Sequence, residues 1–132
     1  MKISKIMVID DSKTIRKSVE LYMKESGYEV ILANDGFDAL SKISEHNPDL
    51  IFVDVTMPRL DGYQTCALIK QSHQYKNTPV LMLSSKGGLF DRAKGRLVGA
   101  DDYLIKPFTK NSLLATVDKY SQQEVAVNQG GI

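Results

Sequence analysis

The stretch LIFVD at residues 50–54 joins four consecutive apolar residues to a terminal acid. It is too short for a typical helix and rich in side chains that suit strands. Its apolar residues do not alternate with polar ones, as they would in a strand with one solvated face. Continuous apolar runs are expected where helices cover both faces of a parallel sheet. The stretch therefore predicts a buried central strand that ends in Asp54.

Similar runs recur along the chain and predict the other strands: KIMVI at 5–9, EVILA at 29–33, PVLML at 79–83 and DYLI at 102–105. Apolar residues at helical spacing predict helices between them, over residues 14–25, 35–47, 62–71, 89–98 and 111–120. The helix at 89–98 should be the softest, because Gly95 in its middle costs about 1 kcal/mol relative to alanine. Alternating strands and helices predict an α/β fold of the flavodoxin-like (βα)5 type. This is a doubly wound sandwich with a parallel five-stranded sheet in order 2-1-3-4-5.

Composition indicates one globular domain, because 42% of the 132 residues are apolar and 25% are charged. We expect this domain over residues 1–120, followed by a flexible tail over 121–132, which is polar and lacks sustained periodicity. A net charge of +1 gives no electrostatic signature of nucleic-acid binding. The absence of a long apolar run and the single cysteine, Cys66, lead us to expect a cytoplasmic protein without disulfides.

Polar residues follow the predicted strands at the points where these strands end. Since ligands of open α/β sheets bind at the carboxyl ends of the strands, these side chains should line one crevice. Along the chain they are Asp10 and Asp11, Asp54, Ser84 and Ser85, and Lys106.

The three carboxylates at this edge call for a cation. Oxygen ligands favour Mg²⁺, or Mn²⁺, over zinc, and Mg²⁺ commonly also binds phosphate oxygens of a substrate. The pattern therefore predicts phosphoryl transfer, with Asp54 as the nucleophile that forms an aspartyl phosphate and Asp10 and Asp11 holding the metal. Lys106 and the hydroxyl of Ser84 would bind other phosphoryl oxygens.

Each of these residues also has an ordinary structural interpretation. The acids after the first strand can cap the following helix together with Ser12. The serines after the fourth strand can be loop residues, and the lysine before Pro107 can be solvated in a turn. Asp54 is harder to explain in this way, because a helix cap is expected nearer Asp61. Convergence of all these residues on one edge favours the phosphoryl site.

Four motifs of the chain resemble, in order and spacing, the CheY-like receiver domain of two-component response regulators: MVIDDS at 7–12, FVDVTMPRLDG at 52–62, PVLMLSS at 79–85 and YLIKPF at 103–108. The resemblance covers about residues 5–120. It implies a phosphoacceptor rather than an enzyme, although the protein could have intrinsic autodephosphorylation activity. The phosphoryl group would come from a sensor histidine kinase or a phosphotransfer domain.

The resemblance also implies the metal ligands. The metal site would consist of Asp10, Asp11, Asp54 and the backbone carbonyl of Thr56. Asp11 is the expected direct ligand, and Asp10 is expected to act through water. Thr56 and Lys86 occupy positions that tune dephosphorylation in the family.

A switch is the third implication. Ser84 matches the switch hydroxyl, with serine in place of the commoner threonine, and Tyr103 matches the switch aromatic. Lys106 matches the phosphoryl-binding lysine, whose bond to Pro107 is usually cis in the family. Phosphorylation would draw Ser84 inward and let Tyr103 turn inward, which would remodel the surface of the fourth helix, the fifth strand and the fifth helix.

Longer stretches are similar to the regulators of chemosensory systems that control type IV pili and twitching motility: residues 8–18, 35–40, 58–70 and 84–108. The implied output is binding to a downstream pilus motor or regulatory protein, with no nucleic acid and no membrane insertion, because the given residues leave no room for an output domain. The alternatives are a receiver of another chemosensory or flagellar system, a degenerate receiver that only binds partners, and a haloacid-dehalogenase-like phosphatase. The phosphatase needs a second acid where this chain has Thr56.

Overall fold

The computed structural model describes residues 2–85 and 87–130, in which strands and helices alternate. The strands are β1 (Lys5–Ile9), β2 (Glu29–Ala33), β3 (Leu50–Asp54), β4 (Val80–Ser84) and β5 (Asp102–Ile105). The helices are α1 (Lys13–Glu25), α2 (Gly36–His46), α3 (Gly62–Gln71), α4 (Leu89–Leu97) and α5 (Lys110–Gly130). The predicted alternation is confirmed. Lys86 lies outside the described residues.

The five strands form one parallel sheet in the order β2-β1-β3-β4-β5. This confirms the predicted flavodoxin-like fold. The register pairs Ile9 of β1 with Val53 of β3, so the residues that come next, Asp10 and Asp54, lie side by side. Asp54 in turn pairs with Leu83 of β4. The carboxyl ends of the central strands therefore meet at one edge of the sheet.

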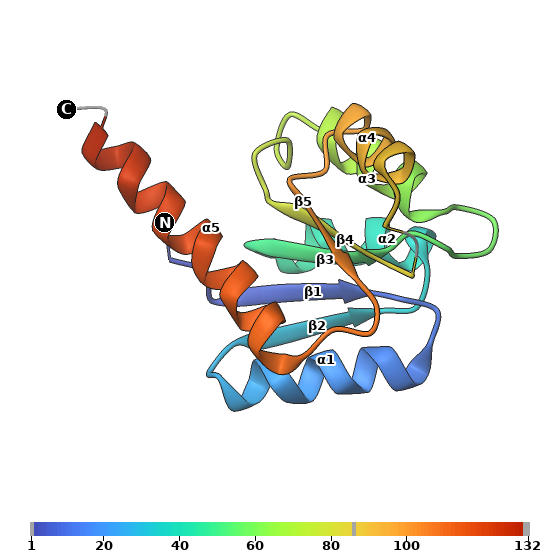
Figure 1. Ribbon diagram of the computed structural model, residues 1–132, viewed down its shortest axis with the longest axis horizontal. Helices are drawn as coiled ribbons and strands as arrows, with labels where there is room; N and C mark the ends of the chain where they lie inside the picture. Colours follow the sequence, from blue (N-terminus) through green and yellow to red (C-terminus); the bar gives the residue numbers. More distant parts are fainter. Residues whose placement is uncertain (1, 86, 131–132) are drawn as a thin grey trace.

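Both faces of the sheet are buried under helices. Along β1, Ile6 and Val8 face one core while Met7 and Ile9 face the other. Helices α1 and α5 cover the first face, and α2 and α3 cover the second; α4 lies on the side of α2 and α3 (Figure 1). Burying each large aliphatic side chain stabilises the fold by about 1.5–3 kcal/mol. Burial on both sides explains why β3 and β4 read as continuous apolar runs.

The helices differ in how their N-termini are held. Ser12, Asp35 and Asp61 each accept a backbone hydrogen bond at the start of α1, α2 and α3, respectively. Helix α4 instead begins after Gly88, which supplies no side-chain cap. Gly95 is the one buried residue among those of α4. Helix α4 is therefore held to the domain by few contacts.

Several boundaries differ from those expected, most of them by one residue, and two of the differences matter for the site or for the C-terminal segment. Strand β4 runs over Val80–Ser84 rather than 79–83, because Pro79 has no N–H to offer the sheet, and Ser84 is thus the last residue of the strand. Helix α5 continues to Gly130, beyond the expected end at Tyr120. The flexibility of residues 121–132 stays a prediction, and residues 131 and 132 lie outside the described part. No helix among the described residues has the length and apolar character needed to cross a membrane.

Candidate functional site

Three acids converge at the carboxyl edge of the sheet. Asp10, Asp11 and Asp54 each place a carboxylate oxygen within 4.8 Å of the other two. Asp10 and Asp54 are buried, whereas Asp11 is exposed, so solvent reaches the cluster on the side of Asp11. Closely spaced carboxylate oxygens are the ligands that Mg²⁺ and Mn²⁺ prefer. The cluster expected from the sequence could thus hold such a metal.

Lys106 bridges two of the acids. Its Nζ lies 3.1 Å from Oδ2 of Asp10 and 3.0 Å from Oδ1 of Asp54. Its backbone N–H donates to the carbonyl of Ser84 over 2.7 Å, which ties the end of β5 to the end of β4. The peptide bond between Lys106 and Pro107 is cis, as the resemblance implied. Lys106 is therefore a member of the acidic cluster and not a solvated lysine in a turn.

The ionisation of the cluster follows from its burial. Burial raises the pKa of the Asp54 carboxyl to about 6. The charge of Asp10 also raises this pKa, whereas the hydrogen bond from Lys106 lowers it. For Lys106, burial lowers the pKa of the ammonium, but the hydrogen bond to Asp54 and the charges of Asp10 and Asp54 outweigh it, so that this pKa is raised. Lys106 thus keeps its proton at neutral pH, whereas Asp54 ionises at an energetic cost.

The raised pKa of Asp54 predicts a stability effect in the metal-free protein. Its folded-state pKa of about 6 exceeds the ordinary value of 3.8, so the ionised form costs stability above pH 6 and this cost disappears as pH falls toward 4. Asp54→Asn should therefore stabilise the metal-free protein at pH 7.5 by on the order of 1 kcal/mol, after allowance for solvent screening. Urea unfolding in EDTA at pH 7.5 and 4.5 measures the difference. An equal gap at the two pH values would contradict this explanation.

The other predicted residues lie on β4, on β5 and in the loop after β3. Ser84 is buried at the end of β4, where it pairs with Ile105, the residue before Lys106. Tyr103 is buried on β5, and its hydroxyl lies 3.4 Å from that of Tyr63 on α3. Thr56 is exposed in the loop that follows β3. Ser84 therefore lies at the edge of the sheet that carries Lys106, whereas the Tyr103 hydroxyl points toward α3. The roles expected for Ser84, Tyr103 and Thr56 stay predictions.

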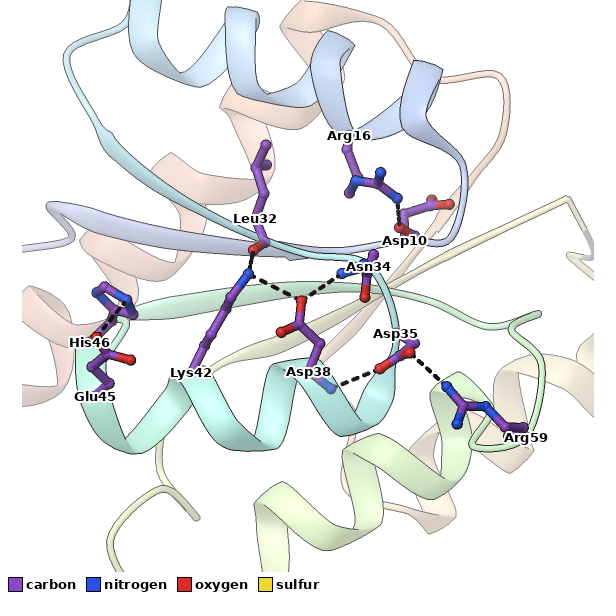
Figure 2. Close-up of polar contacts among 10 residues, drawn as sticks. All are labelled: Asp10, Arg16, Leu32, Asn34, Asp35, Asp38, Lys42, Glu45, His46 and Arg59. Atoms are coloured by element: carbon purple, nitrogen blue, oxygen red, sulfur yellow. Dashed lines mark hydrogen bonds and ion pairs between the residues drawn. The ribbon is translucent and has the colours of Figure 1, made fainter.

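Arg16 is a neighbour of the site that the sequence did not single out. Its Nη1 donates to the backbone carbonyl of Asp10 over 2.6 Å, reaching from α1 to the end of β1 (Figure 2). Oδ1 of Asp10 also accepts the backbone N–H of Ser12 over 2.9 Å. Ser12 caps α1 itself, so the helix-cap interpretation is correct for Ser12 and compatible with a cluster at Asp10. The only hint in the sequence was the position of Arg16, a cationic residue in the first turn of the helix that follows Asp10 and Asp11.

A second neighbour is the loop between β3 and α3. Nη2 of Arg59 lies 2.8 Å from Oδ2 of Asp35, the cap of α2 (Figure 2). The guanidinium of Arg59 also lies 5.3 Å from the ring centre of Phe37. Arg59 has φ 67°, a left-handed conformation that is uncommon for a residue with a side chain. The ion pair and the ring contact hold the loop that follows Asp54 against the start of α2. No sequence motif linked these residues.

Comparisons with known proteins agree with this geometry. Residues 6–118 match the family described as the response regulator receiver domain. Protein PilG of Pseudomonas aeruginosa is 64% identical over 113 residues, which are 86% of this chain and 84% of that protein. The solved structure of the chemotaxis protein CheY4 of Vibrio cholerae superposes with a TM-score of 0.86 at 36% identity, covering 89% of this chain and 98% of that chain.

Other relatives are longer than this chain. The alkaline phosphatase synthesis transcriptional regulatory protein PhoP of Bacillus subtilis is 42% identical over 113 residues, which are 86% of this chain but only 46% of that protein. The chain thus spans less than half of that relative.

Proposed function

The chain belongs to the response regulator receiver domain family, and from this we propose that it accepts a phosphoryl group on Asp54 in a Mg²⁺-dependent reaction. The donor of a receiver domain is a histidine kinase or a phosphotransfer domain. The observation that carries the proposal is the pairing of Lys106 with Asp54 and Asp10 beside Asp11, at adjacent ends of parallel strands. A buried carboxylate with a fixed ammonium beside it suits an acceptor whose product is a dianion.

The residues present fit a Mg²⁺ ion. Asp11, the exposed acid, would bind it directly together with Asp54 and the backbone carbonyl of Thr56. Asp10 already accepts hydrogen bonds from Ser12 and Lys106, which leaves it to act through water. When bound, the metal would neutralise the carboxylates and bind the oxygens of the incoming phosphoryl group.

The chemical step requires an ionised Asp54. One of its carboxylate oxygens forms the new O–P bond while the N–P bond of the phosphohistidine breaks, and the imidazole leaves with the bonding electron pair. Lys106, which already lies 3.0 Å from Oδ1 of Asp54, then pairs with a phosphoryl oxygen. The hydroxyl of Ser84 donates to another one.

The output of this step would be binding to another protein. The new charge shifts an equilibrium between two conformations and alters the surface of α4, β5 and α5. We propose that the downstream partner is a pilus motor or regulatory protein and that the role is control of type IV pili and twitching motility. The identity of 64% with Protein PilG supports this assignment. A receiver of another chemosensory or flagellar system is the alternative.

Beryllofluoride, which mimics a phosphoryl group, tests the proposal. Adding it with Mg²⁺ to the wild type should shift amide resonances around Asp54 and across α4 and β5. Asp54→Asn should show none of these shifts, because beryllofluoride needs the carboxylate oxygen as a ligand. A wild type that responds no more than Asp54→Asn would rule the proposal out, and turnover of a phosphomonoester would favour the phosphatase.

A further inference from the structure

One tyrosine hydroxyl connects three elements beyond the acidic cluster. Tyr63 is buried in the first turn of α3, and its hydroxyl lies 3.3 Å from the backbone carbonyl of Asp91 on α4. The same hydroxyl lies 3.4 Å from that of Tyr103 on β5. Burial raises the pKa of Tyr63, and the hydrogen bond with Tyr103 raises it further, so the phenol keeps its proton. Tyr63 can therefore donate to Asp91 while Tyr103 donates to Tyr63.

Two cations of α4 lie over the same pair of rings. Nζ of Lys94 is 4.6 Å from the ring centre of Tyr63, and Cζ of Arg92 is 5.5 Å from the ring centre of Tyr103. Both distances are within the range in which a cation is attracted to the face of an aromatic ring. Helix α4 thus contacts the tyrosine pair through one backbone carbonyl and two side chains.

These contacts matter because α4 has few others. Its N-terminus at Gly88 lacks a side-chain cap, and Gly95 is the one buried residue among those of the helix. Gly95 itself faces the pair, since a Cβ built there would lie 3.4 Å from Cδ2 of Tyr103. Leu89, Phe90 and Leu97 of the same helix are largely exposed. The position of α4 therefore depends strongly on Tyr63 and Tyr103.

We propose that Tyr63 is a positioning residue for the phosphorylation response, whose hydroxyl holds Tyr103 inward and α4 against α3. Tyr63 thereby affects the fraction of molecules that have Tyr103 in the inward position, both with and without a phosphoryl group. This inference rests on the proposed function, because it concerns the equilibrium that phosphorylation biases. The inward position of Tyr103 is then supported from α3 and α4 as well as by any movement of Ser84.

Tyr63→Phe distinguishes the contribution of the hydroxyl from that of the ring. The variant keeps the packing of the ring and its contact with Lys94, but loses the bonds to Asp91 and Tyr103. Both bonds are long, so we expect a modest effect of about two- to fivefold. Amide hydrogen exchange in α4 should speed up by this factor without a phosphodonor. The beryllofluoride concentration that gives half of the amide response should rise by the same factor.

Two further variants distinguish positioning from general loosening. If the hydroxyls act as one chain, Tyr63→Phe combined with Tyr103→Phe should show no larger effect than Tyr63→Phe alone. Tyr75→Phe is the matched control, because the Tyr75 hydroxyl also donates a hydrogen bond, over 3.0 Å to Oδ1 of Asn47. Asn47 precedes β3, whereas Asp54 is at the other end of that strand. Tyr75→Phe should change neither α4 exchange nor the beryllofluoride titration.

The outcomes separate this inference from the proposed function. A wild type that responds to beryllofluoride, with a Tyr63→Phe variant that matches it in both readouts, would overturn the role of Tyr63 alone. Equal changes in Tyr75→Phe and Tyr63→Phe would overturn it as well. A wild type without any response would contradict the proposed function, and the role of Tyr63 in switching would fall with it.

Discussion

Replacing Lys106 by methionine is expected to lower the unfolding free energy of the metal-free protein by about 3 kcal/mol at pH 7.5. The substitution preserves most of the apolar stem but removes the ammonium that faces Asp10 and Asp54. The side chain of Asp10 is 0% exposed and that of Asp54 is 7% exposed, so water solvates these two carboxylates poorly once the cation is gone. Buried charges left without a partner are among the most costly defects in a folded protein.

The origin of this loss can be tested by removing the charge as well. Asp54→Asn in the Lys106→Met background should recover a large part of the lost stability, because one of the unpaired carboxylates is gone. Lowering the pH to 5 should also reduce the loss. Without Lys106 the pKa of Asp54 should lie above its present value of about 6, so that the carboxyl is protonated at pH 5. Urea unfolding in EDTA measures all of these differences.

A surface ion pair serves as the matched control. Nζ of Lys110 lies only 2.7 Å from Oε2 of Glu25, closer than Lys106 is to either acid, but the two side chains are 40% and 47% exposed. Exposed pairs typically contribute about 0.2–1 kcal/mol. Lys110→Met should therefore change stability far less than Lys106→Met. Equal losses in the two variants would show that burial of the acids is not what makes Lys106 important.

The strand ends could be predicted because their physical cause is local. A strand that helices cover on both faces needs apolar residues along most of its length, so the runs in β1 and β3 mark both the strands and the points where they end. The parallel order then brings Asp10, Asp54 and Lys106 to one edge without any knowledge of their side-chain conformations. The cluster follows from topology, which strand and helix alternation determines.

Contacts that join helices to the sheet could not be predicted in the same way. Periodicity places Tyr63 on the buried face of α3, but it does not say which carbonyl its hydroxyl meets. The same holds for Arg16 and the carbonyl of Asp10, because that bond depends on the docking of α1 and on one side-chain conformation.

The end of α5 was misjudged for a different reason. Polar composition alone does not end a helix, and residues 121–129 contain no glycine or proline.

Gly62→Ala is expected to destabilise the protein by roughly 3 kcal/mol, at the upper end of the range for overpacking. Gly62 is the first residue of α3, and a Cβ there would lie 2.7 Å from Cα of Val55 and 2.8 Å from the carbonyl carbon of Asp54. These are backbone atoms of the segment that carries the acceptor, so no side-chain rotation relieves the clash. The N–H of Gly62 also donates to the carbonyl of Val55 over 2.9 Å, which fixes the approach.

Because the clash acts on Asp54, Gly62→Ala should impair the phosphoryl site as well as the fold. The amide response to beryllofluoride and Mg²⁺ should weaken even where urea unfolding shows that the variant is folded. Gly95→Ala is the matched control, since Gly95 is also buried and helical but a Cβ would lie no closer than 3.4 Å to Met82 or Tyr103. There the gain in helix propensity, up to about 1 kcal/mol, should leave stability unchanged or raised. If Gly62→Ala instead behaves like Gly95→Ala, the close approach of α3 to the end of β3 does not constrain the acceptor, and the position of Asp54 must be set by Lys106 and the sheet alone.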